Sequence, residues 1–220
     1  MSATDTNRPD PQQLRETLRR KFPEASAAAD WEQHVFRSGL PSLDNLFSGG
    51  GIPWGQLIEV TGGLSSGKTS LTLKLLAGLI NDGTAVYADF SQTFFPAAAV
   101  TAGVDIENLW VIRPSNVSAG LRTVELLLSR HLVRGAVLDL AGTKAGPPLS
   151  STLLHRLRQQ TARSRAIVIF LTDSDHSRKL ITPSTVSLRL EVERIAERRI
   201  TLSVAKSRLC REGTKKEVAL

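Results

Sequence analysis

The feature that most constrains this sequence is a short loop from Gly62 to Thr69, which reads GGLSSGKT. The loop satisfies the pattern G-x-x-x-x-G-K-[ST] in full. It lies between an apolar stretch at 56–60, typical of a strand, and the stretch 68–80, typical of a helix. Glycines let such a loop curl so that several backbone N–H groups point at one phosphate, and the helix N-terminus adds a positive dipole end. The sequence therefore predicts a phosphate-binding turn within an α/β fold.

The residue types in this loop predict the ligand as well as the fold. Lys68 can reach the β- and γ-phosphates of a nucleoside triphosphate, and the Thr69 hydroxyl is suited to Mg²⁺. The nucleotide would be bound by the loop and the first helical residues, namely Gly62, Gly63, Leu64, Ser65, Ser66, Gly67, Lys68, Thr69 and Ser70. We therefore expect ATP with Mg²⁺ as the ligand.

An acidic residue at the end of a neighbouring strand would complete the metal site. Asp139 closes the apolar run AVLD at 136–139 and fits the position that holds Mg²⁺ through water in P-loop proteins. A strand-terminal aspartate can also cap the turn that follows it, so the role of Asp139 depends on the loop upstream. Together with that loop, Asp139 is the predicted second metal contact, beside Thr69.

The same loop also contains G-x-S-x-G at 63–67, the pattern of the nucleophile elbow in α/β-hydrolases. A hydrolase would need an acid and a histidine further along the chain, for which Asp139 and His155 or His176 are available. None of these has a supporting signature, and this interpretation leaves the adjacent lysine and threonine unexplained. The phosphate-binding interpretation is therefore favoured.

Apolar runs alternate with helical patterns along the middle of the chain. Strands are expected at 56–60, 85–88, 136–140 and 166–171, and helices at 68–80, 116–132 and 150–162. Continuously apolar strands separated by helices favour a parallel sheet that is covered on both faces. The residues at 186–192 and 200–204 alternate instead, so they are expected to form antiparallel strands at one edge of the sheet.

The predicted organisation is one core flanked by two short segments. Residues 1–35 combine a polar tail, an amphipathic basic helix that begins at Asp10-Pro11, and a linker. Residues 36–212 form the nucleotide-binding core, and residues 213–220 are expected to form a C-terminal tail.

Composition restricts the setting in which the chain works. A single cysteine, Cys210, excludes an internal disulfide framework, and no apolar run approaches the roughly 18 residues needed to span a bilayer. The sequence therefore predicts a cytoplasmic protein without a membrane partner. The net charge of +7 favours a polyanionic partner such as nucleic acid, although a diffusely basic surface would give the same value.

Beyond the loop, the sequence resembles the RecA recombinase core. The segments RSGLPSLD (37–44) and GGGIPWG (49–55) look like the family's lead-in, and GVDIENLWVIRP (103–114) continues the match. The resemblance extends through the Asp139 strand to the segments IVIFL (167–171), VSLRLEV (186–192) and SVAKSR (203–208). It implies a RecA-like three-layer fold, ATP binding, association with DNA and assembly of neighbouring subunits.

The chain departs from the RecA pattern at positions that matter for hydrolysis. The glutamate that activates the attacking water in the family is replaced by Ser91, whose hydroxyl cannot take a proton at neutral pH. Hydrolysis is therefore expected to be weak or absent unless Asp89 or Asp173 serves as the base. Asp173 also stands, after Thr172, where the family has a glutamine that senses the γ-phosphate.

Other nucleotide contacts that the resemblance implies are kept or altered. Lys206 and Arg208 match a basic pair that reaches the ATP phosphates of the neighbouring subunit, although both could simply be exposed on an edge strand. Ala98 stands where the family has an aromatic residue that stacks on adenine, and Phe94 or Phe95 could compensate.

The two family loops that grip single-stranded DNA are short here, at 141–149 and 174–184, so strand exchange is not expected. Association with DNA, with single-stranded DNA favoured, is nevertheless predicted from net charge and resemblance. The candidate basic residues are Arg15, Arg19, Arg20, Lys21, Arg178, Lys179, Arg198, Arg199, Lys206, Arg208, Lys215 and Lys216.

A compact RecA-like chain with these losses resembles the ImuA-type proteins, which are accessory factors of bacterial translesion synthesis and SOS mutagenesis. This resemblance implies an ATP-binding accessory protein of DNA repair that binds DNA, an error-prone polymerase complex with a Y-family-like homologue, RecA, or copies of itself. Two alternatives stay open. One is an active DNA-stimulated ATPase or recombinase paralogue, and the other is a protein-interaction adaptor whose P-loop is occupied but idle.

Overall fold

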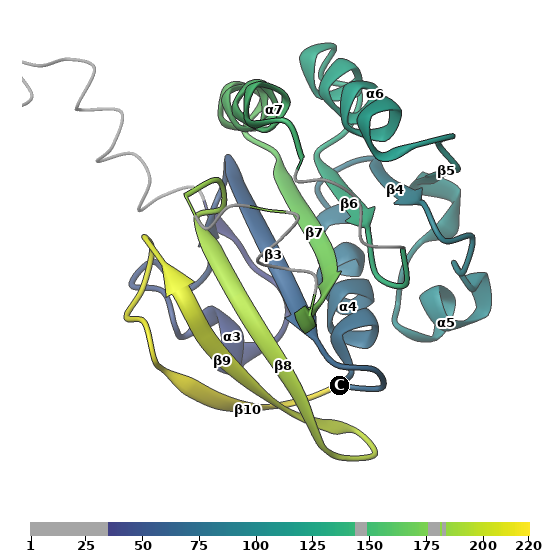
Figure 1. Cartoon of the computed structure of the whole chain (residues 1–220). Coiled ribbons are helices and arrows are strands. Elements are labelled where there is room, and N and C mark those ends of the chain that lie inside the picture. Colours follow the sequence, from purple (N-terminus) through teal and green to yellow (C-terminus); the bar gives the residue numbers. More distant parts are fainter. Residues whose placement is uncertain (1–34, 144–148, 176–180, 182–183) are drawn as a thin grey trace, which may run out of the picture. The chain divides into compact units, whose positions relative to one another are not determined.

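An eight-stranded sheet with helices on both faces forms the framework (Figure 1). The computed structural model describes residues 35–143, 149–175, 181 and 184–220. The strands of the sheet are β3 (Gln56–Gly62), β4 (Ala85–Asp89), β5 (Leu109–Ile112), β6 (Gly135–Asp139), β7 (Ile167–Asp173), β8 (Leu188–Ala196), β9 (Arg199–Ser207) and β10 (Lys215–Ala219). Their order across the sheet is β10-β9-β8-β3-β7-β6-β4-β5.

Helices and short strands complete the described part of the chain. The helices are α3 (Pro41–Asp44), α4 (Lys68–Ile80), α5 (Pro96–Thr101), the 3₁₀ helix η2 (Ile106–Asn108), α6 (Val117–Ser129) and α7 (Ser151–Ser164). A separate two-stranded sheet pairs β1 (Val35–Phe36) with β2 (Ile52–Pro53). Among these described helices, none is both long and apolar enough to cross a membrane.

The predicted mostly parallel α/β fold is confirmed, because β3, β4, β5, β6 and β7 pair in parallel. One part of the prediction was wrong: β8 pairs in parallel with β3, so only the β8–β9 and β9–β10 pairs are antiparallel. The segment 213–220, expected as a tail, contains β10, which extends the sheet beside β9. The predicted N-terminal helix lies outside the described residues.

Two apolar clusters cover the faces of the sheet, which explains why its central strands carry apolar residues on both sides. One cluster joins the sheet to α4 through leucines such as Leu71 and Leu75. The other joins it to α6 and α7, with Leu121 and Leu157 fully buried. Every residue of β3 is buried.

A buried ion pair lies inside this framework, where β3, β7 and β8 are neighbours. The Arg189 Nε donates to the Glu59 carboxylate at 2.6 Å, and the Thr172 hydroxyl donates to the other Glu59 oxygen at 2.9 Å. All three side chains are at most 4% exposed. The charges therefore satisfy each other in the core, which keeps their burial tolerable.

The parallel arrangement determines where the functional residues meet. Gly62, Asp173 and Asp139 are the last residues of β3, β7 and β6, and these strands lie side by side in the order β3-β7-β6. The register pairs Gly62 with Asp173. The carboxyl ends of β3 and β7 point toward the lower part of Figure 1, so the P-loop and both acids lie at one edge of the sheet.

Candidate nucleotide-binding site

The predicted P-loop forms the turn between β3 and α4. Gly67 precedes the helix with φ 91°, and Ser65 has φ 58°, so the loop curls through left-handed backbone conformations. A Cβ at Gly62 would lie 2.4 Å from Ser66 Oγ and 2.6 Å from the Val192 carbonyl oxygen. The glycines are therefore required by close approach as well as by backbone conformation.

The P-loop lysine already has partners within the chain. The Lys68 Nζ donates to the Gly63 carbonyl at 2.9 Å and lies 3.0 Å from Asp173 Oδ1. The Lys68 side chain is only 7% exposed, so its charge is largely removed from bulk water. The other Asp173 oxygen accepts a hydrogen bond from the Gly142 backbone N–H at 2.8 Å.

A cavity of about 330 Å³ surrounds these groups. It is lined by the predicted P-loop residues 64–70, with the exposed Thr69 among them, and by Thr93, Ala141, Gly142, Asp173 and Arg194. We call it the phosphate cavity. Its lining contains backbone N–H groups at a helix N-terminus and two cationic side chains, the donor set that a phosphate chain requires.

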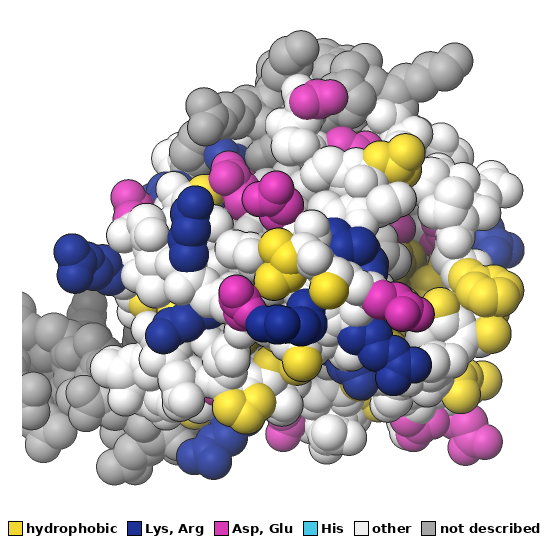
Figure 2. All heavy atoms as spheres, turned by 90° about the horizontal axis from the view of Figure 1, so that it is seen from below, with side chains coloured by type: hydrophobic (Ala, Val, Ile, Leu, Met, Phe, Trp, Pro, Cys, Tyr) yellow, Lys and Arg dark blue, Asp and Glu magenta, His cyan; other side chains and the backbone are white. Residues whose placement is uncertain are grey.

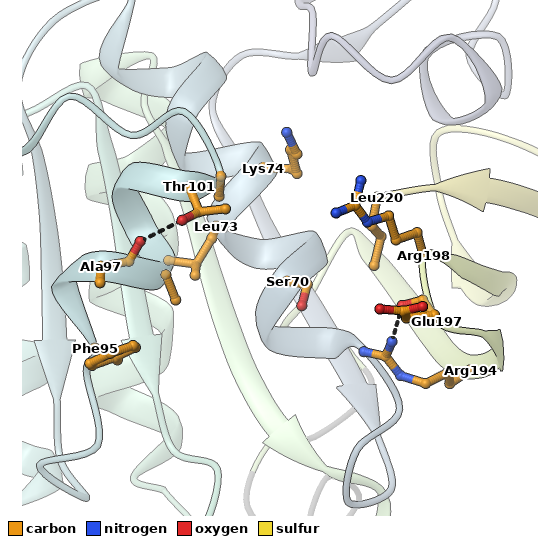
Figure 3. A pocket seen from close by; sticks show the side chains of 12 residues that line it. Ser70, Leu73, Lys74, Phe95, Ala97, Thr101, Arg194, Glu197, Arg198 and Leu220 are labelled. Atoms are coloured by element: carbon orange, nitrogen blue, oxygen red, sulfur yellow. Dashed lines mark hydrogen bonds between the residues drawn. The ribbon is translucent and has the colours of Figure 1, made fainter.

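A second cavity of about 550 Å³ shares Ser70 and Arg194 with the phosphate cavity. We call it the base cavity. Figure 3 shows Phe95, Ala97, Thr101 and Leu73 on one side of Ser70, with Arg194, Glu197, Arg198 and Leu220 on the other. The position of Ala98, where the family places its adenine-stacking residue, is in this lining. The cavity is therefore suited to the base and ribose of a nucleotide whose phosphates lie on the P-loop.

The structure distinguishes the two phenylalanines that could replace the missing aromatic residue. Phe94 packs against Tyr87, with ring centroids 4.7 Å apart, and is held by that contact. Phe95 is 66% exposed and lines the base cavity. Phe95 is therefore the aromatic ring available to a base.

Asp139, the predicted magnesium contact, is buried and hydrogen-bonded. Its Oδ2 accepts from the Tyr87 hydroxyl at 2.5 Å, and its Oδ1 accepts from the Ala141 N–H at 3.1 Å. Burial raises the pKa of Asp139 to about 6, although the Tyr87 hydroxyl, the Ala141 N–H and the Lys68 charge act in the opposite direction. Burial, followed by the Asp139 charge, also raises the pKa of Tyr87, so Tyr87 stays the donor.

The residues nominated as catalytic bases have different surroundings. Asp89 is fully buried, and its oxygens accept from the backbone N–H groups of Thr93 at 3.0 Å and Phe94 at 3.1 Å. Asp89 therefore holds the turn that follows β4. Ser91 bonds the Thr93 hydroxyl at 2.9 Å on the surface. Within the described chain, no group of three or more His, Cys, Asp or Glu residues is arranged to hold a metal ion.

Arg194 is a site residue that the sequence analysis missed. Its Nε donates to the Ser65 carbonyl at 2.8 Å, and another nitrogen donates to the Glu197 carbonyl. The arginine therefore supports the P-loop from β8 and lies where the two cavities meet. Only the register could have revealed this, because Gly62 pairs with Val192, two residues before Arg194.

The predicted basic pair near the end of β9 lies away from these cavities. The Lys206 Nζ donates to the Val186 carbonyl at 3.0 Å, and Arg208 donates to the Ser184 carbonyl at 2.8 Å. Burial lowers the pKa of Lys206, and the neighbouring charge of Arg208 adds to this effect. Neither residue lines the phosphate or base cavity among the described residues.

Arg208 instead lines a third cavity of about 580 Å³ beside the start of α7. The other described lining residues are Ser151, Thr152, Leu154, His155, Arg158, Ser184 and Thr185. We call it the α7 cavity. None of its described lining residues is acidic, so its electrostatic character is cationic. Arg178, Lys179 and His176 lie outside the described residues.

Comparison with known proteins identifies the family. The model of the RecA N-terminal domain matches residues 24–145, more than half of the chain. The chain therefore belongs to the RecA family of P-loop proteins. This assignment removes the α/β-hydrolase alternative, and Ser65 and His155 accordingly line different cavities.

Individual relatives cover part of this chain. Protein RecA of Prochlorococcus marinus (strain NATL1A) is 41% identical over 114 residues, which is 51% of this chain and 29% of that protein. Protein RecA of Roseiflexus sp. (strain RS-1) is 32% identical over 156 residues, which is 62% of this chain and 44% of that protein. The DNA repair protein recA homolog 1, chloroplastic, of Arabidopsis thaliana is 39% identical over 107 residues, 48% of this chain and 23% of that protein. The chain thus spans less than half of the length of these relatives.

A solved structure shares the fold. The crystal structure of the RadB recombinase superposes with a TM-score of 0.65 and covers 83% of this chain and 94% of that chain. The sequence identity is 20%, so this likeness concerns the fold alone.

Proposed function

We propose that this chain is an ATP-binding accessory protein of DNA repair within the RecA family, with weak or absent hydrolysis. The observation that carries the proposal is the phosphate cavity, in which the P-loop, Lys68 and Arg194 are gathered at one edge of the sheet. A cavity that can hold the base and ribose adjoins it through Ser70. This pairing of cavities matches the two ends of one nucleotide.

The residues present fit a nucleotide with Mg²⁺. The loop N–H groups and Lys68 would hold the phosphates, and Phe95 would contact the base. Thr69 would ligate the metal directly, with Asp139 acting through water because both of its oxygens already accept hydrogen bonds. The bound metal would neutralise phosphate charge, and the chain itself supplies orientation and exclusion of water.

Weak hydrolysis follows from the carboxylates near the phosphate cavity. Ser91 offers only a hydroxyl, and Asp89 is fully buried with its oxygens accepting from the backbone. Asp173 is paired with Lys68 and Gly142. None of these groups is suited to receiving a proton from an attacking water at neutral pH. The nucleotide would then act as a switch for conformation or assembly.

Association with DNA is the second part of the proposal. The α7 cavity combines Arg158 and Arg208 with hydroxyl groups at a helix N-terminus, which suits phosphate groups of a nucleic-acid backbone. Elsewhere the charge is mixed: Figure 2 shows Lys and Arg side chains lying among acidic and hydrophobic ones, without a continuous basic patch. The resemblance to ImuA-type proteins favours a role in translesion synthesis beside an error-prone polymerase, with RecA or other copies of the chain as further partners.

The nucleotide part is tested by titrating a fluorescent ATP analogue and by measuring phosphate release. Lys68→Ala should weaken binding of the analogue at least about 10-fold, because a desolvated cation that contacts phosphate is lost. Lys216→Ala, which removes an exposed lysine on β10, is the matched control. Equal binding by Lys68→Ala and the wild type would reject nucleotide binding at the P-loop. Rapid phosphate release that depends on Lys68 and increases with single-stranded DNA would favour the active ATPase instead.

The DNA part is tested by anisotropy of a labelled single-stranded oligonucleotide across a salt series. Contacts to phosphates predict affinity that falls steeply with salt and depends little on sequence. The double substitution of Arg158 and Arg208 by Gln should weaken binding and reduce the salt slope by about 2, one unit for each lost contact. Binding that is insensitive to salt would reject this interface. Partner binding unchanged by nucleotide would favour the adaptor whose P-loop is idle.

A further inference from the structure

We propose that Asp173 takes the place of a terminal phosphate against Lys68 and so makes the site select a nucleoside diphosphate over a triphosphate. The inference rests on the proposed binding of nucleotide at the P-loop. It concerns which nucleotide is accepted, and it assigns that choice to one carboxylate at the end of β7.

The first support is the pairing of Lys68. Its Nζ is engaged by the Gly63 carbonyl at 2.9 Å and by Asp173 Oδ1 at 3.0 Å. With the side chain 7% exposed, this ammonium group has little access to other partners. A phosphate oxygen that approaches Lys68 must therefore displace the Asp173 carboxylate or share the ammonium with it.

The second support is that Asp173 is held in position. Its backbone lies opposite Gly62 in the β3–β7 register, and its Oδ2 accepts from the Gly142 N–H at 2.8 Å. Its side chain is 29% exposed and lines the phosphate cavity. A carboxylate fixed by a strand on one side and a backbone N–H on the other cannot swing away as a surface side chain would.

The third support is the direction in which the nucleotide must lie. The base and phosphate cavities share Ser70 and Arg194, while Asp173 lines only the phosphate cavity among the described residues. Phosphates nearest the base therefore meet Arg194 and the helix N-terminus. The phosphate farthest from the base meets Asp173, and at neutral pH a carboxylate accepts hydrogen bonds but cannot donate one to it.

These charges act differently on the two nucleotides. A diphosphate can use the P-loop and Arg194 without placing a further phosphate beside Asp173. A triphosphate places like charges close together in a partly desolvated cavity, where repulsion is stronger than in water. Asp139 adds negative charge near Lys68, since the Lys68 charge lowers the Asp139 pKa. The cavity therefore attracts two phosphates and resists the third.

The test measures affinities of Mg·ADP and Mg·ATP for the full chain by calorimetry, in the wild type and in Asp173→Asn. Asparagine keeps an oxygen for the Gly142 N–H but removes the charge. We expect the wild type to bind ADP at least about 10-fold more tightly than ATP. We expect Asp173→Asn to strengthen ATP binding by about 10-fold and to change ADP binding less. Asp175→Asn is the matched control, because it removes the same charge at an exposed position two residues away.

The outcomes separate this inference from the proposed function. Equal affinity for ADP and ATP in the wild type, or ATP affinity unchanged by Asp173→Asn, overturns the role of Asp173 while nucleotide binding stands. Binding of ATP by Asp173→Asn alone supports the inference in its strongest form. Binding of neither nucleotide by either protein, with matching circular dichroism and thermal unfolding, overturns the proposed function and this inference together.

Discussion

The hydrogen bond between Tyr87 and Asp139 should stabilise the fold, and its contribution should depend on pH. Tyr87→Phe removes one oxygen from a side chain that is 1% exposed, beside a carboxylate that is 4% exposed. A hydrogen bond to a charged group contributes about 1.5–3 kcal/mol. Asp139 keeps its bond from Ala141, so we expect a loss of about 2 kcal/mol when Asp139 is ionised.

The pH dependence follows from the protonation of Asp139. Burial raises its pKa in the folded chain from 3.8 to about 6, so the folded state binds more protons than the unfolded chain between these values. The contribution of Asp139 to stability therefore falls as pH rises from about 4 to 6, and ionised Asp139 costs on the order of 3 kcal/mol. Because the Tyr87 hydroxyl lowers this pKa, Tyr87→Phe raises it further. The loss caused by Tyr87→Phe should be full at about pH 8 and smaller at about pH 5.

Urea unfolding followed by tryptophan fluorescence at both pH values measures this difference. Asp139→Asn is the second arm, because it removes the buried charge and should be more stable than the wild type at pH 8. In the Asp139→Asn background, Tyr87→Phe should cost only about 1 kcal/mol, as for a neutral hydrogen bond. An equal loss from Tyr87→Phe at the two pH values would refute the claim that it supports a charge.

Three further expectations concern the P-loop, the buried ion pair and the altered catalytic positions. Gly67→Ala should destabilise the fold by about 1–3 kcal/mol in thermal unfolding and weaken nucleotide binding, because φ is 91° and a Cβ would lie 2.7 Å from a side chain of β9. Arg189→Met should lower the unfolding free energy in urea by about 3–5 kcal/mol, because it leaves the Glu59 carboxylate buried without its charge partner, whereas replacing both residues by apolar ones should cost less. Ser91→Glu alone should leave phosphate release slow, and only its combination with Asp173→Gln should raise turnover; a fast single Ser91→Glu variant would show that Asp173 does not oppose the triphosphate.

The interior of the fold could be predicted from the sequence, but its edges could not. The central strands are apolar throughout because both faces are covered, and this pattern is local. The edge strands β5 and β10 lack it: Trp110 in β5 is 43% exposed, and β10 carries Lys215, Lys216 and Glu217. Their strand character comes from pairing with β4 and β9, which no short window of sequence contains. The same reason explains the error for β8, whose direction depends on its partner β3.

The candidate site divides in the same way. The P-loop could be predicted because its chemistry is written in consecutive residues. Its partners Arg194 and Asp173 were not predicted in those roles, because the register of β3 with β8 and β7 brings them to the loop. Asp173 was expected from resemblance at a sensing position and as a possible base. The structure places it in an ion pair with the P-loop lysine.

The arrangement of charges explains why binding and hydrolysis have to be considered separately in this chain. Arg194 and the N-terminus of α4 favour phosphate near the base cavity, whereas Asp173 and Asp139 place negative charge near Lys68. A P-loop that kept its full sequence by chance would have no reason to retain Arg194 against the Ser65 carbonyl. A P-loop built for rapid turnover would not place a carboxylate 3.0 Å from its lysine. Both features are consistent with a site that binds a nucleotide and holds it without fast chemistry.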